Sequence, residues 1–159
     1  VGAYHIIAYD ISANALRRYR DLHKRQAALV NGDLMALALA DGSVDGIYNL
    51  GVMEHFSRDE IDRMLREFHR VLRPSGKIIL FWPPRFGISV RALKLAHFIL
   101  NDILKRNIRL HPAEPMLLSS KHEAERILND AEFELTDFYF GMRDLYTQTV
   151  IVGAPRPRQ

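Results

Sequence analysis

Residues 4–10 read YHIIAYD, an apolar run that ends in a carboxylate, Asp10. A short apolar run of this kind is typical of a buried strand. Ser12 follows at the position of a helix N-cap, so a helix is predicted over 13–25. Ligands of open α/β sheets bind at the carboxyl ends of the strands. Asp10 is therefore a candidate ligand for a nucleotide ribose, with joint capping of the helix by Asp10 and Ser12 as the alternative.

Two more strands are predicted downstream, and each is followed by a distinctive residue. Residues 27–33 read AALVNGD and end in Asp33, and residues 44–50 read VDGIYNL and lead into Gly51. Taken alone, Asp33 could be a turn residue and Gly51 a tight bend. Two acids at the ends of consecutive strands favour a shared crevice at one edge of the sheet.

The clearest helix follows these strands. Ser57 and Glu60 have the spacing of a capping box, and apolar residues then recur on one helical face, at positions 61, 64, 65, 68, 71 and 72. Residues 73–76, RPSG, predict a type I turn. Residues 77–82, KIILFW, predict an almost wholly apolar strand, which is typical of strands buried on both faces of a parallel sheet.

The last part of the chain resumes this alternation after an interruption. Residues 83–119 break the pattern with a segment that is both apolar and basic, and Ser120 and Glu123 then form a second capping-box pattern. The final two strands, within 133–141 and 146–155, are joined by a short connection, which permits an antiparallel hairpin and no parallel crossover.

The alternation of strands and helices predicts a single α/β domain over residues 1–154, with a tail at 155–159. The expected fold is a Rossmann-like, doubly wound, mostly parallel sheet with an antiparallel C-terminal strand. The 159 residues contain no cysteine, which excludes disulfides, thiolate metal sites and cysteine nucleophiles within them. A cytoplasmic location is expected, and no histidine–carboxylate spacing suggests a metal.

The order of these signals matters more than any one of them. A strand ending in Asp10, a strand ending in Asp33, NLGVMEHF at 49–56, a helix, and LRPSGKIILF at 72–81 resemble the class I S-adenosylmethionine-dependent methyltransferases. The resemblance is strongest to the small-molecule branch known as type 11 or ubiquinone-biosynthesis-like. It implies an enzyme that transfers a methyl group from S-adenosylmethionine, built on a seven-stranded sheet with an antiparallel last strand.

The resemblance also implies a role for each residue that matches the family pattern. Asp10 would accept hydrogen bonds from both ribose hydroxyls of S-adenosylmethionine, which suits an ionised carboxylate. Ile11 would lie against one face of the adenine. Asp33 would accept the exocyclic amine of the adenine, and the backbone amide of Leu34 would meet a ring nitrogen.

The methionine portion of the cofactor would lie at the end of the third strand, lined by Asn49, Leu50 and Gly51, largely through their backbone. The family's first strand and glycine-rich loop have no counterpart here, and the N-terminal strand and helix are missing from this chain. We therefore expect about 40 residues to precede Val1, since a domain of roughly 200 residues would then be of ordinary size. A chain that truly began at Val1 would bind the cofactor weakly or not at all.

Methyl transfer needs a base only when the acceptor atom is protonated. His55 is the candidate catalytic base, with a structural role at the helix start as the alternative. His111 and His122 are further candidates. Glu54 is expected to face solvent or a helix terminus.

The segment 83–119 is expected to form a lid over the acceptor, which would be a small, hydrophobic or anionic molecule. Residues 85–111 carry six basic side chains and one acid, so peripheral contact with a membrane surface is an alternative, and core packing or a dimer contact is another. Nucleic acid is not expected as a partner, because no Asn-Pro-Pro-Tyr-type motif follows the third strand to hold a flipped base.

Two other functions fit parts of the pattern. An NAD-dependent oxidoreductase also uses an acid after its second strand to bind a ribose diol, but Gly32 before Asp33 and the closing hairpin disfavour it. A non-catalytic, methyltransferase-like scaffold module is the second alternative. The oligomeric state is not encoded in any pattern that we identify.

Overall fold

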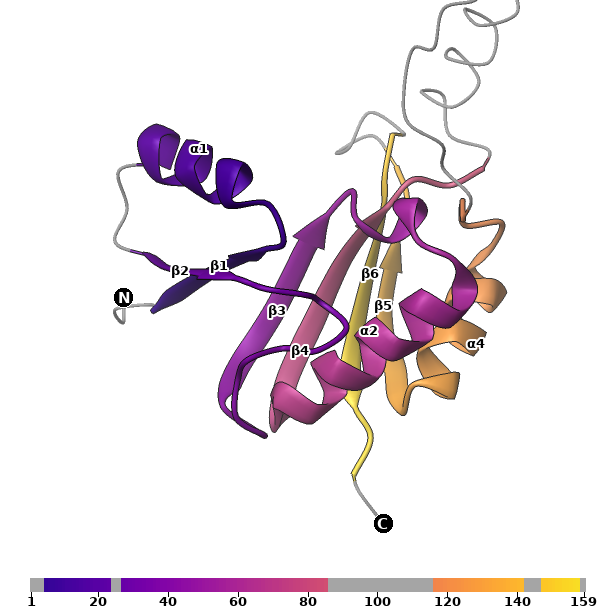
Figure 1. The fold of residues 1–159 in the computed structure, drawn as a ribbon. Coiled ribbons are helices and arrows are strands. Elements are labelled where there is room, and N and C mark those ends of the chain that lie inside the picture. Colours follow the sequence, from indigo (N-terminus) through magenta and orange to yellow (C-terminus); the bar gives the residue numbers. More distant parts are fainter. Residues whose placement is uncertain (1–4, 24–26, 86–115, 142–146, 158–159) are drawn as a thin grey trace, which may run out of the picture. The chain divides into compact units, whose positions relative to one another are not determined.

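The computed structural model describes residues 5–23, 27–85, 116–141 and 147–157 (Figure 1). The chain divides into two compact units, Val1–Ala40 and Asp41–Gln159, which are described in turn. The predicted lid and its basic side chains fall mostly within 86–115, outside the described residues. Among the helices that the structure describes, none has the length and apolarity of a membrane span.

The first unit is a parallel strand pair with one connecting helix. Strand β1 (Ile6–Asp10) pairs with β2 (Ala27–Asn31), and α1 (Ala13–His23) joins them. The Ser12 hydroxyl accepts a hydrogen bond from the Ala15 amide at 3.2 Å, which satisfies one of the free amides of the first turn. The predicted strand, helix and N-cap are thus confirmed.

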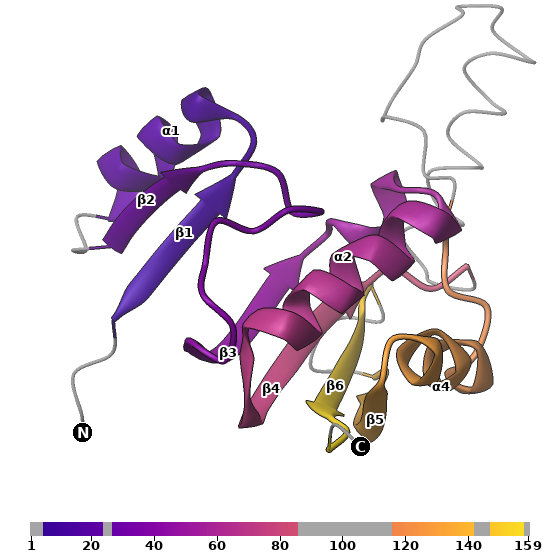
Figure 2. The ribbon, with the colours of Figure 1, turned by 60° about the horizontal axis from the view of Figure 1, so that its bottom comes forward.

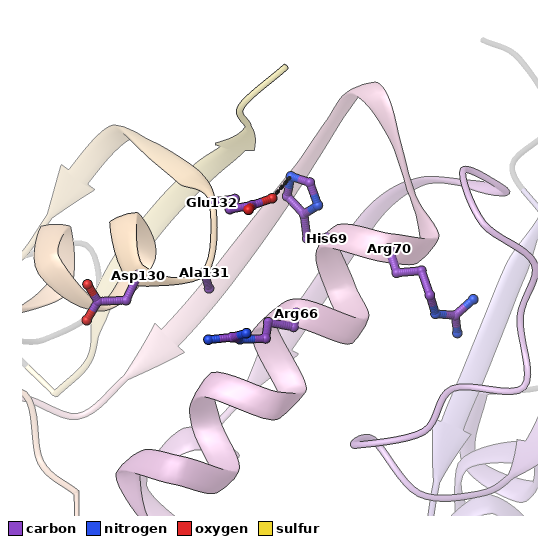
Figure 3. A pocket seen from close by; sticks show the side chains of 6 residues that line it. All are labelled: Arg66, His69, Arg70, Asp130, Ala131 and Glu132. Atoms are coloured by element: carbon purple, nitrogen blue, oxygen red, sulfur yellow. Dashed lines mark ion pairs between the residues drawn. The ribbon is translucent and has the colours of Figure 1, made fainter. Parts of the chain in front are cut away.

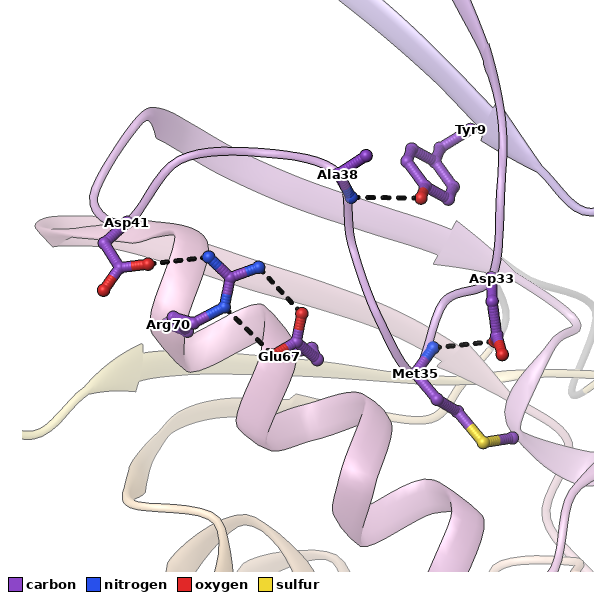
Figure 4. A network of polar contacts seen from close by, with 7 residues as sticks. All are labelled: Tyr9, Asp33, Met35, Ala38, Asp41, Glu67 and Arg70. Carbon is purple, nitrogen blue, oxygen red and sulfur yellow. Dashed lines mark hydrogen bonds and ion pairs between the residues drawn. The ribbon is translucent and has the colours of Figure 1, made fainter.

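Tyr9 closes this unit on itself (Figure 4). Its hydroxyl accepts a hydrogen bond from the Ala38 amide at 3.2 Å, so β1 holds the chain that leaves β2. The ring lies directly over Gly32, where an added Cβ would stand only 2.2 Å from the Tyr9 hydroxyl oxygen and 2.7 Å from the ring carbon that bears it. Glycine is required at position 32 because the tyrosine occupies the space of a side chain.

We expect Gly32→Ala to destabilise the first unit by about 1–3 kcal/mol, the usual cost of overpacking. The new methyl group would displace the Tyr9 ring and break its bond to Ala38. Urea unfolding followed by circular dichroism measures the loss. Gly46→Ala is the matched control, because a Cβ there would meet only the Lys77 carbonyl oxygen, at an ordinary 3.5 Å. Equal stability of the two variants would contradict this packing.

The second unit contains a four-stranded sheet in the order β3-β4-β6-β5. Its strands are β3 (Val44–Leu50), β4 (Leu72–Trp82), β5 (Phe133–Tyr139) and β6 (Thr149–Pro155). Strand β3 runs parallel to β4, whereas β6 is antiparallel to both β4 and β5. The α/β class and the antiparallel C-terminal hairpin are confirmed. No described strand joins this sheet to the β1–β2 pair.

Two helices, α2 (Arg58–Val71) and α4 (Lys121–Asp130), lie along the same face of the four-stranded sheet (Figure 2). Both halves of the predicted capping box form at the start of α2. The backbone amide of Ser57 donates a hydrogen bond to the Glu60 carboxylate, and this bond lowers the pKa of Glu60. The Ser57 hydroxyl lowers the same pKa by a smaller amount. The predicted apolar stripe is buried; the core beneath the two helices includes Ile61, Met64, Leu65, Phe68, Val71, Ile78, Leu80, Trp82, Ile127 and Leu128.

The other face of this sheet corrects one expectation. Ile78 and Leu80 are buried, but Ile79 between them is 37% exposed, so KIILFW is not buried on both faces. On the neighbouring strand Tyr48 is 70% exposed and Leu50 66% exposed. Alternate side chains of a strand point to opposite faces, and both described helices of this unit lie on one of them.

The predicted turn at 73–76 falls within the bounds of β4. These residues belong to β4, which starts at Leu72 and pairs first with Val44 and then, after an irregularity in the register, with Gly46. Gly76 lies in this irregular stretch, where a Cβ would come within 3.1 Å of the Asp45 carbonyl oxygen. The four residues of the predicted turn are thus the stretch of β4 that the register with β3 passes over, between Leu72 and Lys77.

An arginine at the end of α2 fixes the start of β3 (Figure 4). Arg70 donates to Asp41 at 2.6 Å and to Glu67 at 2.8 Å. These two carboxylates, Glu67 first, raise its pKa above the ordinary value. The Gly42 amide donates to the Arg70 carbonyl at 3.0 Å. The ion pairs and the backbone bond together hold the loop before β3 on the helix.

Candidate functional site

Asp10 closes β1 and keeps one carboxylate oxygen away from the local backbone. Its Oδ1 accepts a hydrogen bond from the Ser12 amide at 2.7 Å, which shapes the turn into α1. Among the residues that the structure describes, none donates to Oδ2. The turn and ligand binding therefore need different oxygens, and one residue can serve both of the roles predicted for it.

The ends of β1 and β2 are bonded to each other. The Asp10 carbonyl accepts the Gly32 amide at 3.1 Å and the side-chain amide of Asn31 at 2.9 Å. The same Asn31 amide group donates to the Ile11 carbonyl at 2.8 Å. Asn31, which the sequence analysis missed, thus fixes the backbone of two predicted nucleoside ligands. A polar residue directly opposite Asp10 in the parallel register is the signal that could have identified it.

The loop after β2 contains Asp33 and Leu34. The Asp33 Oδ1 atom accepts the Met35 amide at 2.9 Å (Figure 4), so this acid also forms a local turn. Ile11 is 74% exposed, as an apolar residue awaiting a ligand or another surface would be. The first unit therefore gathers Asp10, Ile11, Asp33 and Leu34 at the carboxyl ends of two paired strands.

The end of β3 carries the other predicted group, in the second unit. Both polar atoms of the Asn49 side chain are buried and have no hydrogen-bond partner among the described residues. Gly51 has a φ of +67°, a conformation that L-residues with a side chain rarely adopt. Its amide donates to the Phe81 carbonyl at 3.2 Å. An unsatisfied buried amide needs a polar partner, and water or a ligand could supply it.

A short 3-10 helix, η1 (Met53–His55), follows this strand end and corrects another expectation. Of the two positions expected for Glu54, solvent is wrong, because its side chain is only 7% exposed, whereas that of His55 is 41% exposed. A helix terminus is not contradicted, since Glu54 lies in the first turn of η1. Glu54 Oε1 lies 3.9 Å from His55 Nε2. The η1 turn directs one residue inward and the next outward, because consecutive residues of a helix do not share a face.

The segment 86–115 leaves and re-enters the described fold at one place. Pro84 and Leu118 form a parallel bridge, and the Arg85 amide donates to the Leu118 carbonyl at 2.8 Å. The Trp82 indole donates to the Met116 carbonyl, also at 2.8 Å. Because β4 ends here, the predicted lid is anchored at the same edge of the sheet as Asn49 and Gly51.

A cavity lies at the opposite edge (Figure 3). It is lined by Arg66, His69 and Arg70 from α2 and by Asp130, Ala131 and Glu132 from the junction of α4 and β5. The helix α2 ends there and both β4 and β5 begin there. Within the second unit the cavity is therefore separate from Asn49 and Gly51. His69 in it packs edge-on against Phe133.

These residues fit S-adenosylmethionine better than a metal. Among the described residues, no group of three histidine, cysteine, aspartate or glutamate side chains could hold an ion. The strand ends of the first unit offer two acids and an exposed apolar side chain, and the end of β3 in the second unit offers a buried polar side chain beside a glycine. The groups of the first unit suit a nucleoside, and those of the second suit the polar groups of an amino acid.

Comparison with known proteins agrees with the ligand that these chemical groups suit. A family model described as "Methyltransferase domain" matches residues 1–80. The "Probable S-adenosylmethionine-dependent methyltransferase Rv3030" of Mycobacterium tuberculosis is 34% identical over 87 residues, which cover 55% of this chain and 31% of that protein. The chain thus spans about a third of the length of this curated relative.

Solved structures share the fold at low identity. A SAM-dependent methyltransferase from Methanosarcina mazei has a TM-score of 0.73 and 16% identity, covering 98% of this chain and 84% of that one. The 1,6-didemethyltoxoflavin-N1-methyltransferase of Burkholderia thailandensis, solved with S-adenosylhomocysteine, has a TM-score of 0.67 and 15% identity, covering 97% and 62%. Both structures confirm the fold prediction. Because the family model matches half of its residues, the chain belongs to the methyltransferase-domain family, of the class I, type 11 kind.

Proposed function

We propose that this chain is the catalytic domain of an S-adenosylmethionine-dependent methyltransferase that acts on a small molecule. The observation that carries the proposal is the family match over residues 1–80, a stretch that contains both strand-end acids, the Asn49–Gly51 strand end and His55. The bound cofactor supplies an activated methyl group on a positively charged sulfur, so the protein mainly has to bind, align and exclude water.

Each strand end has one task in this function. Asp10 and Asp33 accept hydrogen bonds from the ribose and the adenine, and Ile11 covers one face of the base. The backbone at Leu50 and Gly51 lies against the amino-acid portion. The Asn31 bonds to the Asp10 and Ile11 carbonyls support this assignment, because they fix the backbone of two residues that contact the nucleoside before the cofactor binds.

The acceptor in this proposal is small and either hydrophobic or anionic. The hydrogen bonds of Trp82 and Arg85 support it, since the chain leaves the described fold at Arg85 and re-enters it at Met116, at the edge where β3 and β4 end. His55 follows β3 at the same edge and remains 41% exposed, so it can serve as the base for a protonated acceptor. Contact of the basic segment with a membrane surface is the competing use of that insertion.

Titration calorimetry with the purified natural protein tests the proposal. We expect S-adenosylmethionine to bind with a dissociation constant in the micromolar range and NAD(H) not to bind. Binding of NAD(H) alone would replace the proposal by the oxidoreductase alternative. Binding of neither cofactor would favour the non-catalytic scaffold. Anionic liposomes added in a sedimentation assay, with Arg91 and Lys94 neutralised as the comparison, test the membrane alternative separately.

A further inference from the structure

A buried carboxylate lies at the cofactor edge of the second unit and has no role in the function described above. Glu54 is 5% exposed as a residue, and it sits in η1, directly after the strand end that carries Asn49 and Gly51. Burying an ionised carboxylate costs free energy unless its surroundings compensate for the lost hydration. Its position beside the methionine-binding backbone suggests that its charge is used there.

The surroundings hold this side chain in place. Glu54 Oε1 would be only 3.1 Å from a Cβ on Gly51, so the carboxylate packs against the backbone of the strand end. The Glu54 carbonyl accepts the Met116 amide at 3.4 Å, and the His55 amide donates to Val52 at 3.1 Å. Met53, its neighbour in η1, is fully buried. The backbone that carries the carboxylate is therefore fixed by hydrogen bonds on both sides.

The two forms of the cofactor differ by one charge. S-adenosylmethionine carries a positive sulfonium, whereas S-adenosylhomocysteine, left after methyl transfer, carries a neutral thioether. A charge that is shielded from water interacts more strongly with another charge than an exposed one does. A buried carboxylate near Gly51 would therefore attract the donor and act only weakly on the product.

We propose that Glu54 selects the charged methyl donor over its neutral product. This inference rests on the proposed function, because it requires the amino-acid portion of the cofactor to lie at Gly51. Two features support it independently: the contact between the Glu54 carboxylate and Gly51, and the buried amide of Asn49 on the same strand end, which has no partner within the described part of the chain. His55 Nε2 lies 3.9 Å from the Glu54 carboxylate, and the His55 side chain is 41% exposed.

The test is a comparison of two affinities in the natural protein. Glu54→Gln keeps the shape of the side chain and removes the charge. We expect the dissociation constant of S-adenosylmethionine to rise on the order of tenfold and that of S-adenosylhomocysteine to stay within about twofold, because only the first ligand loses an ionic attraction. Glu54→Asp keeps the charge and should keep the preference for the donor. Asp59→Asn, at an exposed position five residues away, is the matched control and should change neither affinity.

Equal weakening of both ligands by Glu54→Gln would show that the side chain is only structural, and two unchanged affinities would show that its charge does not reach the cofactor; either result overturns the inference. Both results leave the proposed function intact, since the wild-type protein would still bind S-adenosylmethionine. Failure of the wild-type protein to bind either ligand would instead overturn the proposed function. Circular dichroism of each variant checks folding, and the ratio of the two affinities remains interpretable if a variant is less stable.

Discussion

Replacing Asp10 by asparagine should weaken the binding of S-adenosylmethionine by about 100-fold. Asparagine can still accept the Ser12 amide through its oxygen, so the turn into α1 survives. What is lost is the ionised acceptor for the ribose diol, and hydrogen bonds to charged groups are worth about 1.5–3 kcal/mol each. Isothermal titration calorimetry with the wild-type and variant proteins measures the change.

The same substitution distinguishes the contribution of the nucleoside to binding from that of the sulfur. Because both cofactor forms contain the ribose, Asp10→Asn should weaken S-adenosylhomocysteine as much as S-adenosylmethionine, unlike Glu54→Gln. Asp33→Asn should have a smaller effect, on the order of tenfold, since it contributes a single bond to the adenine. Asp21→Asn in α1 is the control: this exposed acid pairs with its neighbour Arg20. An Asp10→Asn variant that binds like the control would remove Asp10 from the site.

Local patterns predicted most of the elements, because their causes are local. The helix α2 followed from a hydroxyl and a carboxylate three residues apart and from apolar residues repeating on one face; both were confirmed. The antiparallel pairing of β5 and β6 followed from the length of their connection. Such features depend on neighbours in the sequence, so the sequence is sufficient to find them.

Errors arose where distant residues decide the outcome. The strand after α2 was expected to begin at Lys77, but β4 begins at Leu72, and its register with β3 jumps across RPSG from Leu72 to Lys77. The sequence contains no signal for the exposure of Ile79, which depends on which face the helices cover. The buried position of Glu54 depends on Gly51 and on the returning chain at Met116, and the Asn31 bonds depend on the register of two strands. The individual roles of the predicted site residues stay predictions, as does the single-domain boundary at residue 154.

The second large effect is expected in the core of the second unit. Trp82, the only tryptophan in the chain, is 1% exposed and packs at the end of β4. Trp82→Ala should lower the free energy of unfolding by about 3–5 kcal/mol, the usual cost of removing a buried aromatic side chain. Urea unfolding monitored by far-UV circular dichroism measures this loss, since the variant contains no tryptophan whose fluorescence could report unfolding. Glu125→Ala, on the exposed side of α4, is the control and should change stability by less than about 0.5 kcal/mol.

Trp82→Phe separates the packing of the ring from its hydrogen bond. Phenylalanine fills most of the same space but cannot donate to the Met116 carbonyl, a bond of 2.8 Å in the wild-type protein. We expect a loss of about 1–2 kcal/mol, part of it from the carbonyl left without its donor. Because this bond fixes the point where segment 86–115 returns to the fold, the variant should also bind the acceptor less tightly while its affinity for S-adenosylmethionine stays the same. If the variant bound both ligands less tightly by the same factor, Trp82 would support the whole edge of the sheet. The insertion would then have no separate role in binding the acceptor.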